Sequence, residues 1–316
     1  DARIYAHLTT DECTLYIDTS GEPLFKRGWR ADKGDAPLKE TLAAAMLAAS
    51  GWSMGDGTSA NPNGLVAQGV PLYDPCCGSG TIAVEAAQIA CNIAPGSMRR
   101  FGFEKLVPFQ AHVWQGLLNT AREQEHAPSA PVFGSDVAFR MVDFAQRNAE
   151  RAGVAHAVQL RGGDALQRMP PSEVPGVMLV NPPYGERIEA AGVAGAARRA
   201  RYAPPTEYVS PYEDVDQHGD AGFDDAIDDG MVRNDVPRFG ARDIAQTEDG
   251  GDFFAQLASH WKKNYAGWSA WMLTPDLKLP GRMRFKESRR VPMWNGPIEC
   301  RMFRFDLRAG SMRNKP

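Results

Sequence analysis

Apolar and polar positions alternate along the chain in a pattern that predicts strands and helices in turn. Short apolar runs with β-branched or aromatic residues, typical of buried strands, occupy 72–74, 132–134, 158–160, 177–180 and 268–273. Helical spacing of apolar residues occurs at 37–50, 82–90, 109–125, 139–152 and 252–261. Near the C-terminal end, 282–291 and 298–307 alternate as an antiparallel hairpin. Strands that alternate with helices predict an α/β fold with a largely parallel sheet.

The N-terminal part shows a different pattern. Residues 3–8 and 13–18 alternate around a polar stretch, which predicts a separate hairpin. A basic segment follows, in which Phe25 and Trp29 are interleaved with Lys26, Arg27, Arg30 and Lys33. This composition suits RNA contact, and it equally suits a solvated linker. Because the chain does not begin with Met and opens on strand-like sequence, we expect an N-terminal portion to be missing.

Composition narrows the class of protein. The chain has 316 residues, 43% of them hydrophobic, enough for one large α/β domain or two smaller ones. It contains neither an apolar run of membrane-spanning length nor a signal-peptide pattern, so we expect a cytoplasmic protein without a membrane partner. The five cysteines lack metal-ligand spacing, which favours reduced thiols and no metal.

Charge is unevenly distributed along the chain. The net charge of −4 disfavours a nucleic-acid partner, but residues 189–250 hold 14 acidic and 6 basic residues, which leaves the rest of the chain positive. This acidic segment has little apolar periodicity. We therefore expect a mobile acidic insertion that cannot fold by itself.

A glycine-rich turn follows the strand at 72–74. Asp74 leads into Pro-Cys-Cys-Gly-Ser-Gly, and a helix begins directly afterwards. Glycines allow close backbone approach and a helix N-terminus offers free N–H groups, so this turn is suited to cradle a nucleotide-like ligand. It matches neither the phosphate loop of ATPases nor the dinucleotide fingerprint. Asp74 could hold a cationic amine or order the loop, which fits S-adenosylmethionine. The cofactor-binding candidates here are Asp74, Cys76, Gly78, Ser79 and Gly80.

Two further carboxylates follow predicted strands. Asp136, at the end of the second strand, could accept both hydroxyls of a ribose, and it could also cap the next helix. Asp164, after the third strand, could reach an adenine amino group or cap the short turn at 165–168. Both are candidate cofactor ligands.

The strand at 177–180 ends in Asn181-Pro182-Pro183-Tyr184. The Asn181 side-chain oxygen and the Pro182 carbonyl are two acceptors that could point at one amino group, and the Tyr184 ring could cover a flat base. These three are the catalytic candidates, and Asn181 is also placed beside the cofactor. Asn, Pro and Gly are common turn residues, so an ordinary turn explains the tetrapeptide equally well.

Together these motifs resemble class I S-adenosylmethionine-dependent methyltransferases that act on amino groups. The segment from Asp18 to Arg30, the stretch Pro37-Leu-Lys-Glu-Thr-Leu-Ala-Ala-Ala45 and Asn181-Pro-Pro-Tyr-Gly-Glu-Arg187 look like the bacterial 23S rRNA guanine-N2 methyltransferases that carry a THUMP domain. The resemblance covers most of 1–188 and 251–307, and the 189–250 insertion departs from it.

The resemblance implies a Rossmann-like, seven-stranded mixed sheet whose last strand is antiparallel. It implies S-adenosylmethionine as cofactor and a guanine of 23S rRNA, in the large ribosomal subunit precursor, as substrate. Residues 1–30 would be the tail of a THUMP-type RNA-binding domain with its linker, and 31–316 the methyltransferase domain.

Other functions share some of these features. Adenine-N6 DNA methyltransferases and glutamine-N5 protein methyltransferases use the same tetrapeptide. A non-catalytic RNA-binding ribosome-assembly factor could keep the fold, although the intact cofactor and acceptor motifs argue against it. The glycine pattern makes a nicotinamide dehydrogenase the least favoured reading.

Overall fold

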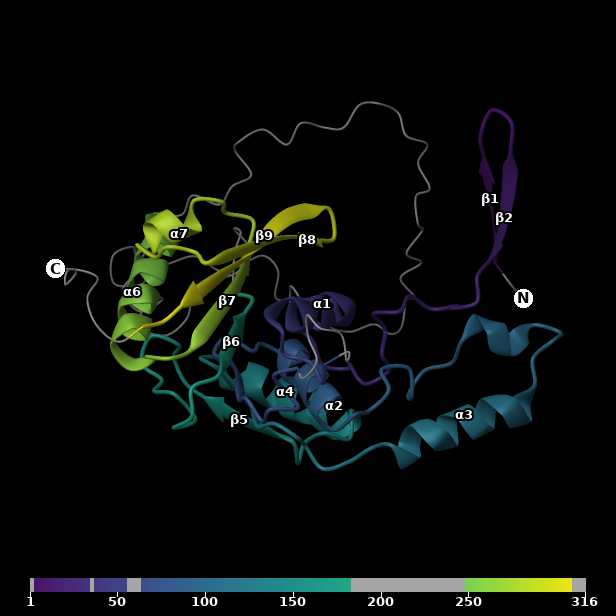
Figure 1. Cartoon of the computed structure of the whole chain (residues 1–316), viewed down its shortest axis with the longest axis horizontal. Coiled ribbons are helices and arrows are strands. Elements are labelled where there is room, and N and C mark those ends of the chain that lie inside the picture. Colours follow the sequence, from purple (N-terminus) through teal and green to yellow (C-terminus); the bar gives the residue numbers. More distant parts are fainter. Residues whose placement is uncertain (1–2, 35–36, 56–63, 183–247, 309–316) are drawn as a thin grey trace, which may run out of the picture.

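The computed structural model describes residues 3–34, 37–55, 64–182 and 248–308 (Figure 1). Its centre is a seven-stranded sheet with the order β5-β4-β3-β6-β7-β9-β8. The strands are β3 (Leu72–Asp74), β4 (Val132–Asp136), β5 (Val158–Gly162), β6 (Val177–Val180), β7 (Ser269–Thr274), β8 (Arg289–Asn295) and β9 (Ile298–Asp306). The first five run parallel, and β9 is antiparallel to both β7 and β8. The predicted α/β fold and its antiparallel last strand are confirmed.

Helices cover both faces of the sheet. On one face lie α1 (Glu40–Ser50), α2 (Thr81–Ala90) and α4 (Phe139–Arg151), which share one buried core with side chains such as Leu72, Leu179 and Leu273. On the other face lie α6 (Glu248–Asn264) and α7 (Leu279–Arg282), whose core includes Met178 and Phe303. Successive residues of one strand enter opposite cores because side chains alternate across a sheet. Burial on both faces explains why these strands read as continuous apolar runs.

Two parts project from this body. The helix α3 (Ala111–Glu123) extends away from the sheet in Figure 1, preceded by the short 3₁₀ helix η1 (Gly102–Lys105). An aromatic cluster joins them, in which the Trp114 ring meets the edges of Phe101 and Phe103 at 5.7 and 5.0 Å between centroids. Strands β1 (Ile4–Leu8) and β2 (Cys13–Ile17) form the predicted hairpin, with every residue exposed.

The segment after this hairpin is tied to the residues before α3. The Phe103 N–H donates to the Thr19 carbonyl at 3.0 Å. The Arg99 guanidinium donates to the carbonyls of Ser20 and Pro23 at 3.0 and 2.9 Å. The Arg99 side chain therefore holds the backbone of residues 20–23 in place.

Two predictions need correction or restriction. The strand predicted at 282–291 begins only at Arg289, because Pro280 starts the helical turn α7 and Arg284, with φ +50°, reverses the chain. The insertion predicted at 189–250 falls almost entirely outside the described residues, except that α6 already begins at Glu248. Within the described residues no helix is long and apolar enough to cross a membrane.

Candidate active site

The predicted site residues lie at one edge of the sheet. Strands β4, β3 and β6 are parallel neighbours, and β5 pairs with β4, so their carboxyl ends meet. Asp74 ends β3, Asp136 ends β4, Asp164 follows β5 and Asn181 follows β6. Ligands of parallel α/β sheets bind at this edge. The fold therefore brings together candidates that are more than 100 residues apart in the sequence.

The glycine-rich loop, residues 75–80, arches from β3 over the end of β4. Its backbone is bound to β4 by the Cys77 N–H, which donates to the Ser135 carbonyl at 2.9 Å, and by the Gly78 N–H, which donates to the Asp136 carboxylate at 2.9 Å. Gly78 and Gly80 have φ angles of +52° and +88°, a region that favours glycine. A Cβ at Gly80 would lie 2.8 Å from the Ala145 Cβ of α4, whereas none of the described atoms lies within 4 Å of one at Gly78. The loop is therefore packed against α4 at Gly80 and leaves open space at Gly78.

Asp136 holds the loop rather than capping a helix. One carboxylate oxygen accepts from Gly78, and the other accepts from the Ala138 N–H at 2.9 Å. The N-cap of α4 is Ala138, without a side-chain cap. The predicted capping role of Asp136 is therefore wrong. Each oxygen keeps a free lone pair, so the predicted contact with two hydroxyls stays compatible with this geometry.

Three carboxyl groups, those of Asp74, Asp136 and Asp164, gather at this edge of the sheet. Asp74 is 1% exposed, and burial raises the pKa of its carboxyl to about 8, although a hydrogen bond from the Cys76 N–H opposes the shift. Burial also raises the pKa of the Asp136 carboxyl. Burial raises the pKa of the Cys76 thiol, and the charges of Asp74, Asp136 and Asp164 raise it further. A cationic group that binds beside these carboxyl groups would favour their ionised form over their protonated form.

Asp164 orders the turn that follows β5. Its carboxylate accepts from the Leu166 N–H at 2.9 Å, and its carbonyl accepts from Gln167 and Arg168, also at 2.9 Å. The predicted turn-capping role is present. Contact with an adenine amino group stays a prediction.

Asn181 shows the clearest sign of a missing partner. Its side-chain oxygen Oδ1 is shielded from solvent and has no hydrogen-bond partner within the described residues. Pro182 is buried beside it. Pro183 and Tyr184 lie outside the described residues, so the stacking role of Tyr184 stays a prediction. Buried acceptors without a partner are rare in proteins and costly.

The sequence matches a known family over this region. The profile of the RMKL-like methyltransferase domain matches residues 27–197, more than half of the chain. The chain belongs to this family. The match includes the glycine-rich loop and the tetrapeptide at 181–184 and begins within the basic segment after the hairpin. The chain thus contains an RMKL-like domain.

Curated relatives share most of the chain. A protein of Shewanella pealeana named "Ribosomal RNA large subunit methyltransferase K/L" is 34% identical over 318 residues, covering 99% of this chain and 35% of its own length. The protein of the same name from Psychromonas ingrahamii is 32% identical, covering 95% and 31%. This chain spans about a third of these relatives.

Solved structures share the fold of the RMKL-like domain. SMU.472 complexed with SAH has a TM-score of 0.69 at 24% identity, over 98% of this chain and 63% of that one. A possible methylase from Clostridium difficile 630 has a TM-score of 0.68 at 25% identity, over 99% and 63%. A protein titled a predicted N6-adenine-specific DNA methylase from Listeria monocytogenes reaches 0.65 at 25%, over 96% and 60%. The class I methyltransferase fold is thereby confirmed.

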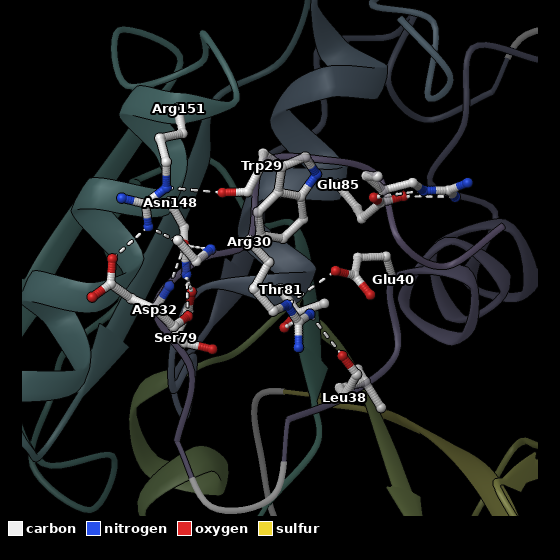
Figure 2. A network of polar contacts seen from close by, with 12 residues as sticks. Trp29, Arg30, Asp32, Leu38, Glu40, Ser79, Thr81, Glu85, Asn148 and Arg151 are labelled. Carbon is white, nitrogen blue, oxygen red and sulfur yellow. Dashed lines mark hydrogen bonds and ion pairs between the residues drawn. The ribbon is translucent and has the colours of Figure 1, made fainter. Parts of the chain in front are cut away.

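The basic segment after the hairpin has a role that sequence reasoning missed. We define residues 27–33 as the linker. Arg27 forms an ion pair with Glu85 of α2 at 3.1 Å, Arg30 forms one with Glu40 of α1 at 3.0 Å, and Trp29 is fully buried. The RNA-contact interpretation is therefore wrong for these three residues, since they pack into the RMKL-like domain (Figure 2).

An aromatic network under the site was also missed. The hydroxyls of Tyr73 and Ser135 share a hydrogen bond of 2.7 Å at the centre of the sheet. The Tyr73 ring stacks on Tyr265, whose hydroxyl donates to the Arg168 carbonyl at 2.7 Å. Through the Arg168 carbonyl, this network contacts the turn that begins at Asp164. Its signal in the sequence was weak, because a tyrosine in an apolar run is ordinary core sequence.

Among the described residues there is no cluster of side chains suited to hold a metal ion.

Proposed function

We propose that the chain is an S-adenosylmethionine-dependent methyltransferase that modifies the exocyclic N2 amino group of a guanine in 23S rRNA. The observation that carries this proposal is Oδ1 of Asn181, which is buried and has no hydrogen-bond partner within the described residues, at the sheet edge that also carries the open glycine-rich loop. The names of the curated relatives support the rRNA substrate, and the complex of SMU.472 with SAH supports the cofactor.

The residues of the cofactor pocket fit this cofactor. When bound, S-adenosylmethionine supplies an electrophilic methyl group on a sulfonium. Asp74 and its neighbouring carboxylates would attract the cationic methionine part, and Asp136 would accept from the ribose hydroxyls. Gly78 leaves room in front of the loop for the ligand.

Asn181 and Pro182 would act on the acceptor amine. The lone pair of a guanine amine is delocalised into the ring, which makes the amine a poor nucleophile. If Asn181 Oδ1 and the Pro182 carbonyl accept hydrogen bonds from its two N–H groups, the lone pair turns toward the methyl group. The same acceptors stabilise the positive charge that develops on nitrogen. Tyr184 would stack on a base taken out of its helix, and much of the rate would come from alignment of the two reactants.

The C-terminal part of the domain supports an RNA substrate by its charge. Residues 276–308 contain nine basic and four acidic residues, and each of the four carboxylates pairs with an arginine. The remaining basic residues are all exposed: Lys278, Arg284, Lys286, Arg289 and Arg308. Phosphate contacts by such residues supply most of the affinity for RNA. Between Arg282 and Arg290, these contacts would fall to Arg284, Lys286 and Arg289.

We also keep two domain proposals. The exposed hairpin β1–β2 would be part of a THUMP-type RNA-binding module, which agrees with its lack of buried residues. The acidic segment 189–250 would be an insertion next to the acceptor site.

One rival function has a specific observation in its favour. The Listeria monocytogenes neighbour is titled an N6-adenine-specific DNA methylase, and Asn181 could orient an adenine amine by the same two acceptors. The test is to incubate the chain with labelled S-adenosylmethionine and unmodified 23S rRNA, and to identify the methylated nucleoside by mass spectrometry. We expect N2-methylguanosine. Appearance of N6-methyladenosine, or transfer to DNA in preference to rRNA, would overturn the assignment.

A further inference from the structure

The linker is joined to the glycine-rich loop and the start of α2 in two ways, directly at Thr81 and through Asn148 at Ser79. Figure 2 shows Trp29, Arg30 and Asp32 between α2 and α4, beside Ser79 and Thr81. The Arg30 guanidinium donates to the Thr81 hydroxyl and to the Leu38 carbonyl, each at 2.7 Å, while its Nε lies 3.0 Å from the Glu40 carboxylate. Thr81 is the first residue of α2, directly after the glycine-rich loop.

Asn148 forms the second contact, from the middle of α4. Its side chain is fully buried. Its Nδ2 donates to the Ser79 carbonyl of the loop at 2.9 Å and to the Asp32 carbonyl of the linker at 2.8 Å. Its Oδ1 accepts from the backbone N–H groups of Ala31 and Asp32, both at 3.3 Å, and from Arg151 at 2.6 Å. One amide thus joins three segments: linker, loop and helix.

We propose that Asn148 and Arg30 are positioning residues for the cofactor loop, and that residues 30–32 of the linker are thereby a part of the cofactor site. This inference rests on the proposed function, in which residues 75–80 bind S-adenosylmethionine.

The loop needs such support because of its own sequence. Gly78 and Gly80 allow the backbone many conformations in the absence of external contacts, and ordering them costs conformational entropy. On the β4 side the loop is held by Ser135 and Asp136, and on the α4 side by Asn148. If the contact on the α4 side is lost, cofactor binding must order the loop, and affinity falls.

The coupling is reciprocal by thermodynamic linkage. If the linker stabilises the binding-competent loop, bound cofactor must stabilise the linker to the same extent. Contacts that restrain Ala31 and Asp32 then act on cofactor affinity through Asn148.

Arg27 provides a matched control, because it stabilises the linker without contacting the glycine-rich loop. Arg27 ties the same linker to the same helix α2, through a two-pronged contact with Glu85 at 3.1 and 3.2 Å. Glu85 lies four residues beyond Thr81, about one helical turn away from the loop. Arg27→Gln should therefore lower stability without moving the loop.

The experiment compares Arg30→Lys and Asn148→Asp with Arg27→Gln. Asn148→Asp keeps the acceptor for the Ala31 and Asp32 N–H groups and removes the donor to the Ser79 and Asp32 carbonyls. Arg30→Lys keeps the charge beside Glu40 and loses the guanidinium nitrogen Nη2 that donates to both Thr81 and Leu38. Affinity for S-adenosylhomocysteine is measured by calorimetry on the full chain, and the unfolding free energy by urea denaturation.

We expect Arg30→Lys and Asn148→Asp to weaken S-adenosylhomocysteine binding about tenfold, the scale of one lost hydrogen bond. Arg27→Gln should leave the affinity unchanged at a similar loss of stability. Equal affinity of all folded variants and the unmodified chain would overturn the inference. Failure of the unmodified chain to bind S-adenosylhomocysteine would instead refute the proposed function.

A second measurement needs no variant. Hydrogen exchange at the Ala31 and Asp32 amides, which both point at Asn148, should slow when S-adenosylhomocysteine is added. The amide of Lys26, which donates to the Pro23 carbonyl outside this network, should be unaffected. Equal exchange at Ala31 and Asp32 with and without ligand would contradict the coupling.

Discussion

Asn181→Ala should remove activity without the usual loss of stability. In the free protein, Asn181 Oδ1 is buried and unpartnered within the described residues. An unsatisfied buried acceptor costs about 1–3 kcal/mol, which the alanine variant no longer bears. Lost packing of a half-buried side chain offsets part of this gain. We therefore expect the unfolding free energy to stay constant or to rise by up to about 1–2 kcal/mol.

The same change should act in the opposite direction on catalysis. Removal of one preorganised hydrogen-bonding group at a reacting centre lowers turnover by about 10²- to 10³-fold. Affinity for S-adenosylhomocysteine should change little, because the loop and Asp136 are untouched. The assay is single-turnover methyl transfer to 23S rRNA, with urea denaturation of the same preparations.

Asn264 provides the matched control. It is a half-buried asparagine whose amide donates to the carbonyl and to the ring nitrogen of His260 at 3.1 and 2.9 Å. Asn264→Ala should lose about 1 kcal/mol of stability and keep its activity. If Asn181→Ala is destabilised as much as Asn264→Ala, the Asn181 amide is satisfied after all. Wild-type turnover by Asn181→Ala would refute its role as acceptor of the amine protons.

Three further outcomes follow from the geometry. Asp136→Ala should weaken S-adenosylhomocysteine binding by about 1–3 kcal/mol, as measured by calorimetry, and unaltered affinity would leave Asp136 as a tie between loop and strand only. Because the pKa of Asp74 is raised to about 8 when folded, the free protein holds its proton where the unfolded chain has lost it. Its contribution to stability is full below about pH 4 and declines by about 1.4 kcal/mol per pH unit up to about pH 8, so Asp74→Asn should flatten the pH dependence seen in urea denaturation. The double change Lys286→Glu and Arg289→Glu should raise the KM for rRNA and reduce its salt dependence. Lys263→Glu, at an exposed lysine in the last turn of α6, is the control, and equal effects of the two would argue against a specific RNA surface.

The sequence by itself determined the order of strands and helices and most of the candidate site. The signals were local: β-branched runs at 72–74 and 177–180, helical spacing at 139–152, and glycines where the backbone needs φ angles of +52° and +88°. Periodicity and backbone preference depend on neighbouring residues, so they can be read without knowing the fold. Strand order then placed Asp74, Asp136 and Asn181 at one edge, because carboxyl ends of parallel strands coincide.

Tertiary structure decided which polar groups have a hydrogen-bond or ion-pair partner, and which residues those partners are. Arg27 and Arg30 look like a basic surface in sequence, yet they pair with Glu85 and Glu40, 58 and ten residues further along the chain. Asn148 reads as one polar position in an amphipathic helix, and packing places its amide between the linker and Ser79. Such partners depend on burial and on the close approach of distant segments, which local pattern does not encode. The oxygen of Asn181 is the same kind of fact, since only the packed chain shows that it is buried and that the described residues offer it no partner.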